Sequence, residues 1–417
     1  MPEFLTLQPP IEALLKLIKA LPVIIPTSEL IDTVHSLGRV TAKPVYAPFA
    51  LPTFPRSTVD GYAVRAAETF GANDSLPVYL KLSGEILMGS VANLQLEPTR
   101  CVLIHTGGML PDGADAVVMV EYTQSSHSGE IEIFRSVGVG ENTIKVGEDV
   151  AFGEEVIPLG SRIRPAEIGG LMALGLIQVE VVRKPRIGII SSGDEIVPPE
   201  IELKPGQVHD INAYTLSALV LECGGEPVGY GITPDKEDAL HTVAERALSE
   251  CDVVVITAGS SASTRDLTAQ VINSLGQPGV LVHGVNLRPG KPTILAVCKG
   301  KALIGLPGNP VSALVVASLF VVPVVELLLG LRHTTGISRR NLSPTLRGRL
   351  NANVPSQAGR EDWIPVRVVE TPTGIQAEPV FSKSNLIFSL VRADGLIYIP
   401  PNITGLSAGE TVEIVFP

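Results

Sequence analysis

Between Lys184 and Leu329, short runs of branched apolar residues alternate with longer segments in which apolar residues recur at helical spacing. The runs predict strands over 186–191, 227–232, 252–257, 279–285, 293–297 and 302–306. The segments between and after them predict helices over 213–222, 237–248, 267–275 and 311–329. This alternation is typical of a doubly wound α/β sheet, parallel at least in its first half.

The regions on either side of this sheet have a different texture. Helical periodicity predicts helices over 10–21, 29–37 and 165–174, with Ser28 as a suitable N-cap for the second. From 51 to 142, short strands separated by glycine, proline and serine predict a β-rich module. Short strands and turns return after Gly330, which predicts a small terminal β-barrel or sandwich.

Composition narrows the class of partner. A chain of 417 residues is expected to hold two to four domains, since a domain has roughly 100–200 residues. Hydrophobic residues make up 45 % of the chain, so intrinsic disorder is excluded. The 32 basic and 43 acidic side chains give a net charge of −11, which disfavours nucleic acid as a partner. We therefore expect a small-molecule ligand.

Three features bear on the compartment. The four cysteines are far apart and form no C-x-x-C pair, which predicts buried thiols in a reducing environment. The first twenty residues lack a basic leader, so we expect a cytoplasmic protein. The apolar segment 313–329 is interrupted by Ser318, Pro323 and Glu326, which favours a core helix kinked or bounded at Pro323 over a membrane span.

Five loops are expected at one edge of the sheet, because the carboxyl ends of parallel strands meet there. All are polar or rich in glycine: 191–195, 233–235, 258–266, 288–291 and 307–310. Small residues let backbone N–H groups reach an anion, which Arg288 and Lys291 can neutralise. Glu195, Asp235 and Asp266 can supply oxygen ligands to a divalent cation. The pattern predicts a phosphate-bearing ligand together with magnesium.

Familiar catalytic motifs do not explain this edge. Gly284 and Gly290 are one residue too far apart for a P-loop.

The β-rich module contains two further candidate segments. Asp60 precedes a glycine in a predicted tight turn that presents a carboxylate, and Thr106-Gly-Gly is predicted to form a backbone nest that suits an anion. Taken alone, each of these two segments is more often a turn than a site.

Together, however, these segments resemble the molybdopterin molybdenumtransferase family, the MoeA type that also forms the E domain of gephyrin. The resemblance covers nearly the whole chain. Its most specific parts are Val-Asp-Gly-Tyr-Ala at 59–63 and Leu-Pro-Gly-Asn-Pro at 306–310. The full set of matching segments is 37–39, 52–64, 106–120, 140–142, 147–149, 192–195, 210–212, 288–292 and 305–312.

The resemblance implies four domains. A discontinuous linker and dimerisation domain would comprise 1–50 and 143–182, with the β-rich module inserted at 51–142. A MogA-like molybdopterin-binding sheet domain would span 183–332, and a C-terminal β domain would span 333–417. An elongated homodimer is implied, with two clefts that are each shared between the subunits.

The implied reaction is the magnesium-dependent insertion of molybdate or tungstate into adenylylated molybdopterin, with release of AMP. A MogA-type adenylyltransferase is an implied partner, and neither nucleic acid nor a membrane is expected. Matched position by position, the resemblance assigns catalysis to Asp60, Glu195, Asp235 and Asp266, with the last three at magnesium. Substrate binding is expected of Thr106, Asp149, Ser192, Gly193, Gly259, Ser261, Arg288, Lys291, Pro307, Gly308 and Pro310.

The chain departs from the family pattern in the loop at 258–266. Ala258 and Ser263 replace glycines, Ala269 stands where a lysine is common, and Arg288 also replaces a lysine. These departures leave open the choice between molybdate and tungstate. Two other functions compete with the transferase: a scaffold of the gephyrin type, and adenylyl transfer to molybdopterin by the sheet domain alone. Retention of Glu195, Asp235, Asp266 and Lys291 favours an enzyme over a scaffold. The segments 51–142 and 331–417 argue against adenylyl transfer by the sheet domain alone, because that activity would not need them.

Overall fold

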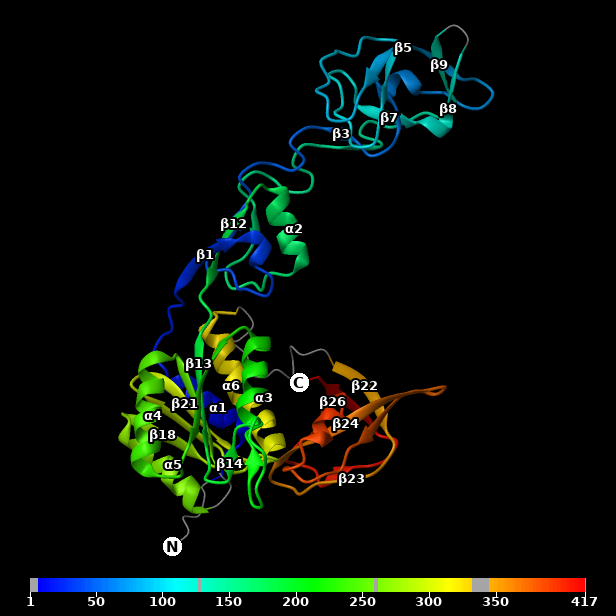
Figure 1. Cartoon of the computed structure of the whole chain (residues 1–417). Helices are drawn as coiled ribbons and strands as arrows, with labels where there is room; N and C mark the ends of the chain where they lie inside the picture. Colours follow the sequence, from blue (N-terminus) through cyan, green and yellow to red (C-terminus); the bar gives the residue numbers. More distant parts are fainter. Residues whose placement is uncertain (1–6, 127–128, 259–261, 332–344, 417) are drawn as a thin grey trace.

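The computed structural model describes residues 7–126, 129–258, 262–331 and 345–416, with the backbone alone for 262–266. Figure 1 shows an elongated chain with a β-rich lobe at one end, a small middle domain, and a sheet domain beside a β-barrel at the other end. The chain passes through the middle domain on its way to the lobe and again on its way back. The multidomain α/β fold with a β-rich insertion is therefore as predicted.

Six strands form the sheet of the sheet domain: β13 (Arg186–Ser192), β16 (Glu226–Thr233), β17 (Val253–Ala258), β18 (Pro278–His283), β20 (Ile294–Cys298) and β21 (Lys301–Pro307). Their order is β16-β13-β17-β21-β20-β18. In this order, β16, β13, β17 and β21 are parallel to one another, whereas β20 runs antiparallel to both of its neighbours. β17 is buried along its whole length, as expected of a central parallel strand. The predicted parallel first half is confirmed.

Helices cover both faces of this sheet. Those on one face are α1 (Pro10–Ala20), α3 (Asn212–Cys223) and α6 (Pro310–Leu328), and those on the other are α4 (Glu237–Glu250) and α5 (Ala262–Ser274). We expected the first helix to belong to the discontinuous domain. Instead, α1 buries Ala13, Leu14 and Leu17 in the core of the sheet domain, because its apolar stripe fits beside α6.

The helix α6 is a core element. By length and composition it could cross a membrane, but 67 % of its most apolar window is buried inside the fold. The predicted core helix is therefore confirmed. The alternative that Pro323 bounds the helix is wrong, because α6 continues through Pro323 to Leu328.

All four cysteines are buried and free, as predicted. Burial raises the pKa of the Cys101 thiol to about 12.

The middle domain corrects one predicted helix. Residues expected to form a helix over 29–37 form β1 (Ser28–Asp32) and a single 3-10 turn over Thr33–His35. β1 pairs antiparallel with β12 (Gln178–Val182), a partner about 150 residues away, so a distant strand overrode the local periodicity. The remaining elements are β2 (Val45–Tyr46), β11 (Glu155–Ile157) and α2 (Pro165–Ala173), the last as predicted.

The β-rich lobe holds a six-stranded sheet in the order β7-β4-β6-β5-β9-β8. The strands are β4 (Gly61–Val64), β5 (Val78–Ile86), β6 (Arg100–Ile104), β7 (Ala116–Met119), β8 (Thr123–Ser125) and β9 (Glu130–Ile133). At the base of the lobe, β3 (Arg56–Ser57) pairs with β10 (Thr143–Ile144). The entry and exit of the lobe are thus tied together.

The C-terminal region is a closed five-stranded barrel, which settles the predicted choice between barrel and sandwich. Its strands are β22 (Thr345–Leu350), β24 (Glu361–Thr371), β25 (Gly374–Pro379), β26 (Gly395–Ile399) and β28 (Thr411–Val415). Closure comes from the β24–β26 pairing. The shorter elements are β14 (Ile196–Val197), β15 (Val208–His209), β19 (Leu287–Arg288), β23 (Val354–Pro355), β27 (Gly405–Leu406) and α7 (Phe388–Val391).

Candidate functional site

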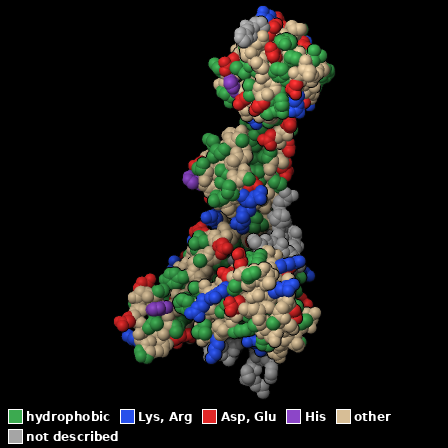
Figure 2. All heavy atoms as spheres, turned by 90° about the vertical axis from the view of Figure 1, so that its right-hand side faces the viewer, with side chains coloured by type: hydrophobic (Ala, Val, Ile, Leu, Met, Phe, Trp, Pro, Cys, Tyr) green, Lys and Arg blue, Asp and Glu red, His purple; other side chains and the backbone are tan. Residues whose placement is uncertain are grey.

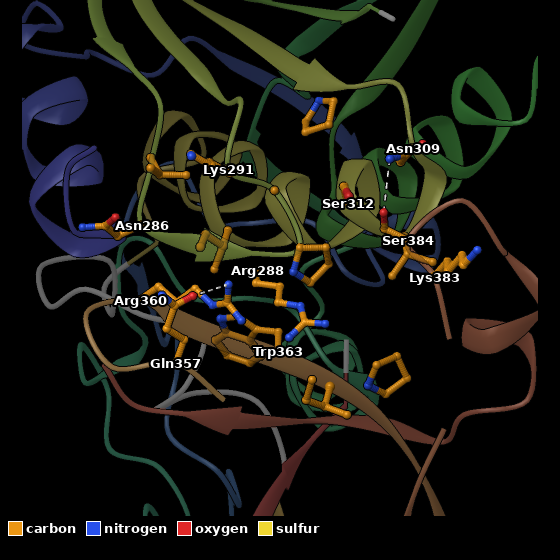
Figure 3. A pocket seen from close by; sticks show the side chains of 18 of the residues that line it. Asn286, Arg288, Lys291, Asn309, Ser312, Gln357, Arg360, Trp363, Lys383 and Ser384 are labelled. Atoms are coloured by element: carbon orange, nitrogen blue, oxygen red, sulfur yellow. Dashed lines mark hydrogen bonds between the residues drawn. The ribbon is translucent and has the colours of Figure 1, made fainter. Parts of the chain in front are cut away.

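A cleft of about 830 Å³ lies between the sheet domain and the barrel (Figure 3). It is lined by 285–292 after β18, by residues at the start of α6, and by barrel residues within 354–365 and 380–384. Backbone contacts join the two domains beside it. β19 pairs in parallel with β24, and the N–H of Glu361 donates to the carbonyl of Asn286 at 2.9 Å. The cleft is therefore built across a hydrogen-bonded domain junction.

The loop that carries Arg288 and Lys291 is held close against α6. Gly290, between them, has φ +121°, and a Cβ there would lie 2.4 Å from Cγ2 of Val316. Only glycine fits this conformation and this approach. The hydroxyl of Thr293 donates to the Gly290 carbonyl at 2.6 Å, within the buried part of the loop. The two cationic side chains thus project from a fixed backbone.

The cleft is strongly cationic. Among the lining residues in the described part of the chain, four carry positive charge and none is an aspartate or a glutamate: Arg288, Lys291, Arg360 and Lys383. Figure 2 shows several Lys and Arg side chains on the barrel side of the lower domains. Guanidinium and ammonium groups form short, charge-assisted hydrogen bonds to anions. The cleft is therefore suited to phosphates or other oxyanions.

A second group of polar residues lies at the carboxyl edge of β13 and β16. The Ser192 hydroxyl donates to Oδ1 of Asp235 at 2.6 Å, and the N–H of Asp235 donates to Oδ1 of Asp194 at 3.2 Å. A Cβ on Gly193 would lie 2.8 Å from Cδ1 of Ile196 and 3.0 Å from Oε2 of Glu195, so the loop is tightly packed at this glycine. Ser192 and Asp235, both predicted, are thus brought into direct contact.

Three buried polar atoms at this edge have no hydrogen-bond partner: Oγ of Ser191, Oγ1 of Thr257 and Oδ1 of Asn212. Ser191 and Thr257 are register partners on neighbouring strands. Buried polar atoms in proteins are nearly always satisfied, so atoms left without a partner indicate a place where a polar ligand or water binds. The edge therefore offers unused hydrogen-bonding capacity.

The two polar regions are joined through the loop before α6. Nδ2 of Asn212 donates to the carbonyl of Gly308 at 2.9 Å, and Nδ2 of Asn309 donates to Oγ of Ser384 in the barrel at 3.1 Å. Pro307 lines the cleft, and the buried Pro310 opens α6. The predicted loop at 307–310 therefore connects the sheet edge to the cationic cleft.

A third group lies in the β-rich lobe, at the far end of the chain (Figure 1). Oδ1 of Asp60 accepts the backbone N–H of Thr106 at 2.7 Å and its hydroxyl at 3.1 Å. These hydrogen bonds, with a smaller contribution from His105, lower the pKa of the exposed Asp60 carboxyl. His105 also contacts Glu85 at 2.8 Å. Asp149 is exposed in the loop beside the lobe.

The structure brings together some of the predicted residues and separates others. Arg288, Lys291 and Pro307 meet in the cleft, but Asp60 and Thr106 lie in a different lobe of the same chain. Gly259 and Ser261 lie outside the described residues, as does the side chain of Asp266, whose backbone belongs to α5. The described residues contain no group of three His, Cys, Asp or Glu that could hold a metal.

The sequence analysis did not find the barrel side of the cleft: Gln357, Arg360, Trp363, Lys383 and Ser384. No local motif marks these residues, because they reach the site only when the barrel docks on the sheet domain. A cationic residue close to the edge of a terminal barrel strand is too common to serve as a signal.

The fold and the cleft define a class: multidomain α/β proteins with a cationic cleft between a doubly wound sheet and a terminal barrel. Family models match nearly the whole chain. The MoeA N-terminal region (domain I and II) matches 9–175, a domain described as a probable molybdopterin binding domain matches 188–327, and the MoeA C-terminal region (domain IV) matches 347–416. The chain therefore belongs to the MoeA family of molybdopterin molybdenumtransferases, enzymes of molybdenum cofactor biosynthesis.

Individual relatives agree. A Methanocaldococcus jannaschii protein named for molybdopterin biosynthesis is 34 % identical over 395 residues, covering 92 % of this chain and 91 % of its own. The molybdopterin molybdenumtransferase of Bacillus subtilis is 31 % identical over 392 residues, covering 93 % and 89 %. The crystal structure of a MoeA protein from Pyrococcus horikoshii has a TM-score of 0.85 at 30 % identity, covering 99 % of this chain and 100 % of that one.

Proposed function

We propose that this chain transfers molybdate or tungstate to adenylylated molybdopterin in a magnesium-dependent reaction that releases AMP. The observation that carries the proposal is the cleft lined by four cationic side chains and, among its described lining residues, by no carboxylate. Molybdate and tungstate are dianions, and the phosphates of the adenylylated substrate are negative as well. Such a surface favours both ligands by charge and by hydrogen bonding.

The sheet edge supports the pterin half of the proposal. The unpartnered atoms of Ser191, Thr257 and Asn212 offer hydrogen bonds to a polar ring system. Because Asn212 also binds the carbonyl of Gly308, a ligand at this edge would lie next to the loop that leads into the cleft. Holding the pterin and the oxyanion in adjacent sites would convert an encounter of two solutes into a step within one complex.

We propose that magnesium binds between the acidic residues of the sheet edge and the phosphates of the substrate. Mg²⁺ usually keeps several waters and takes one or two carboxylates together with substrate phosphates, rather than a closed protein cage. Asp235 and Glu195 offer carboxylates at the sheet edge, with Asp266 as a third candidate. When bound there, the ion would neutralise negative charge on the phosphates. The chain's own part would be to orient Asp235 through Ser192.

A homodimer is part of the proposal. Asp60, Thr106 and Asp149 belong to the far end of an elongated chain, so they would complete a cleft only if a second subunit supplied them. The adenylylated substrate would come from a MogA-type adenylyltransferase. We place the reaction in the cytoplasm, where the four buried thiols would stay reduced.

The test is reconstitution. The purified chain would be incubated with adenylylated molybdopterin, Mg²⁺ and either oxyanion, and both AMP release and activation of a cofactor-free molybdoenzyme would be measured. We expect AMP release to require both the oxyanion and Mg²⁺. We also expect the double variant Arg288→Ala/Lys291→Ala to raise the KM for the oxyanion. Lys299→Ala, which removes an exposed lysine paired with Glu245, is the matched control. AMP release at the same rate with and without the oxyanion would contradict the proposal.

A further inference from the structure

Asp362 lies where the two arginines of the cleft meet. Its side chain is 0 % exposed. Oδ1 accepts a hydrogen bond from Nε of Arg360 at 2.8 Å, and Oδ2 accepts one from Nη2 of the same guanidinium at 3.2 Å. Nη1 of Arg288 lies 3.6 Å from Oδ2. One buried carboxylate therefore contacts a guanidinium from the barrel and a guanidinium from the sheet domain.

The position of Asp362 follows from the pairing that joins the two domains. Arg288 on β19 and Asp362 on β24 are register partners in the short parallel ladder. Arg360 is held from a third direction, because its Nη1 donates to Oε1 of Gln357 at 3.2 Å. A bidentate contact fixes the plane of a guanidinium that would otherwise sample many rotamers. Figure 3 shows Arg288, Arg360 and Trp363 together on one side of the cleft.

We infer that Asp362 is a positioning residue for the oxyanion: it holds Arg288 and Arg360 at a fixed separation so that both contact the same tetrahedral anion. The inference rests on the proposed function and adds how the cleft is preorganised. Both arginines line the cleft, whereas Asp362 itself does not. It acts through its partners and touches no substrate.

A role in positioning and a role in charge alone predict opposite results. Asp362 is negative, so its replacement by asparagine makes the cleft more positive. If only net charge mattered, an oxyanion would then bind more tightly. If Asp362 positions the arginines, the oxyanion binds more weakly, because both guanidiniums lose the partner that orders them.

The test uses direct binding and needs no turnover. Trp363 is the only tryptophan of the chain and lines the cleft beside these residues, so its fluorescence can report oxyanion binding. Molybdate and tungstate would be titrated into the full chain at constant ionic strength, with equilibrium dialysis as a second measurement. We expect Asp362→Asn to raise Kd about tenfold, the lower end of the effect of removing a residue that orients a metal ligand.

Two more variants complete the design. Arg360→Lys keeps the charge but cannot make the bidentate contact, so it should also weaken binding. In the Arg360→Lys background, adding Asp362→Asn should raise the oxyanion Kd by a much smaller factor than Asp362→Asn does in the wild-type chain. Glu413→Gln, which breaks the Arg347 pair elsewhere in the same barrel, should leave Kd unchanged.

Each outcome has a distinct meaning. Unchanged or tighter binding by Asp362→Asn would overturn the positioning role and leave the proposed function intact. An unfolded Asp362→Asn would shift the decision to Arg360→Lys, whose wild-type affinity would overturn the inference. If the wild-type chain bound neither oxyanion in dialysis, the proposed function of the cleft would fail, and the inference with it.

Discussion

The cationic cleft and the Asp60 group of the lobe are opposite in charge. The cleft presents arginines and lysines from a loop packed on α6 and from a barrel strand hydrogen-bonded to that loop. The lobe presents the exposed carboxylate of Asp60, whose pKa is lowered by hydrogen bonds from Thr106, with His105 beside it and Glu85 in contact with His105. The charge of the cleft favours an anion. In the lobe, the backbone N–H and the hydroxyl of Thr106 donate to the Asp60 carboxylate.

We infer from this difference that the cleft and the lobe, which lie far apart within one chain, contribute to different steps of the reaction. Affinity for the oxyanion should reside in the cleft, whereas changes in the lobe should affect the rate after binding. The following predictions test that division, beginning with the largest expected effect.

The first prediction concerns subunit sharing. We expect Asp60→Ala and Arg288→Ala homodimers each to lose about a hundredfold or more of AMP-release activity, because each cleft then lacks one charged group. Subunits mixed and reassembled in equal amounts should recover about a quarter of the wild-type rate, since half the dimers are mixed and each has one intact cleft. No recovery, with heterodimers demonstrated by tag pull-down, would show that the two residues do not share a cleft.

The second prediction separates binding from rate. Lys383→Ala should raise the KM for the oxyanion about tenfold with little change in kcat, because a charge-assisted contact is lost. His105→Gln should leave that KM unchanged and lower kcat. Steady-state kinetics over a range of oxyanion concentrations would decide. If both variants altered KM equally, the proposed division between the regions would be wrong.

The third prediction concerns the rigidity of the cleft. Gly290→Ala should destabilise the chain by about 2–4 kcal/mol, because the new methyl group would overlap Val316 at a positive φ. Gly229→Ala in β16 is the matched control, since nothing lies within 4 Å of a Cβ there. Urea unfolding followed through Trp363 would measure both. Equal stability of the two variants would mean that the loop adapts rather than holding Arg288 and Lys291 in place.

The smallest expected effect concerns Asp60. Its pKa is lowered first by the Thr106 backbone bond, then by the Thr106 hydroxyl, and least by His105. Thr106→Val should therefore raise this pKa part of the way to its ordinary value, and by more than His105→Gln does. The stabilisation that Asp60 provides is present above its ordinary pKa and is lost as the pH falls through the lower folded value. Carboxyl NMR titration would establish the order.

The sequence predicted the sheet domain well because its strands carry an unbroken local signal. The runs in β13, β17 and β21 are buried on both faces, and each is flanked by a helix that follows its own period. The segment Ser28–Asp32 misled the prediction because its partner, Gln178–Val182, is remote in sequence. Its mixed apolar and polar pattern fits a helix as well as a strand.

The candidate site divides in the same way. Loops that directly follow predicted strands were found, including Ser192, Asp235 and Arg288, since sheet topology alone places them at one edge. Arg360, Lys383 and Asp362 were missed because they belong to a separate domain. Their contribution depends on how the barrel docks on the sheet domain, and no periodicity predicts the β19–β24 pairing or the Asn309–Ser384 hydrogen bond at that junction.

The β3–β10 pairing at the base of the lobe has a practical consequence. Since Ser57 and Thr143 are neighbours in space, and the N–H of Leu51 donates to the carbonyl of Val150 at 2.8 Å, the chain leaves and re-enters the middle domain at almost one point. We therefore expect that the lobe can be deleted and its ends joined by a short turn, or replaced by the lobe of a relative, while the middle domain still folds.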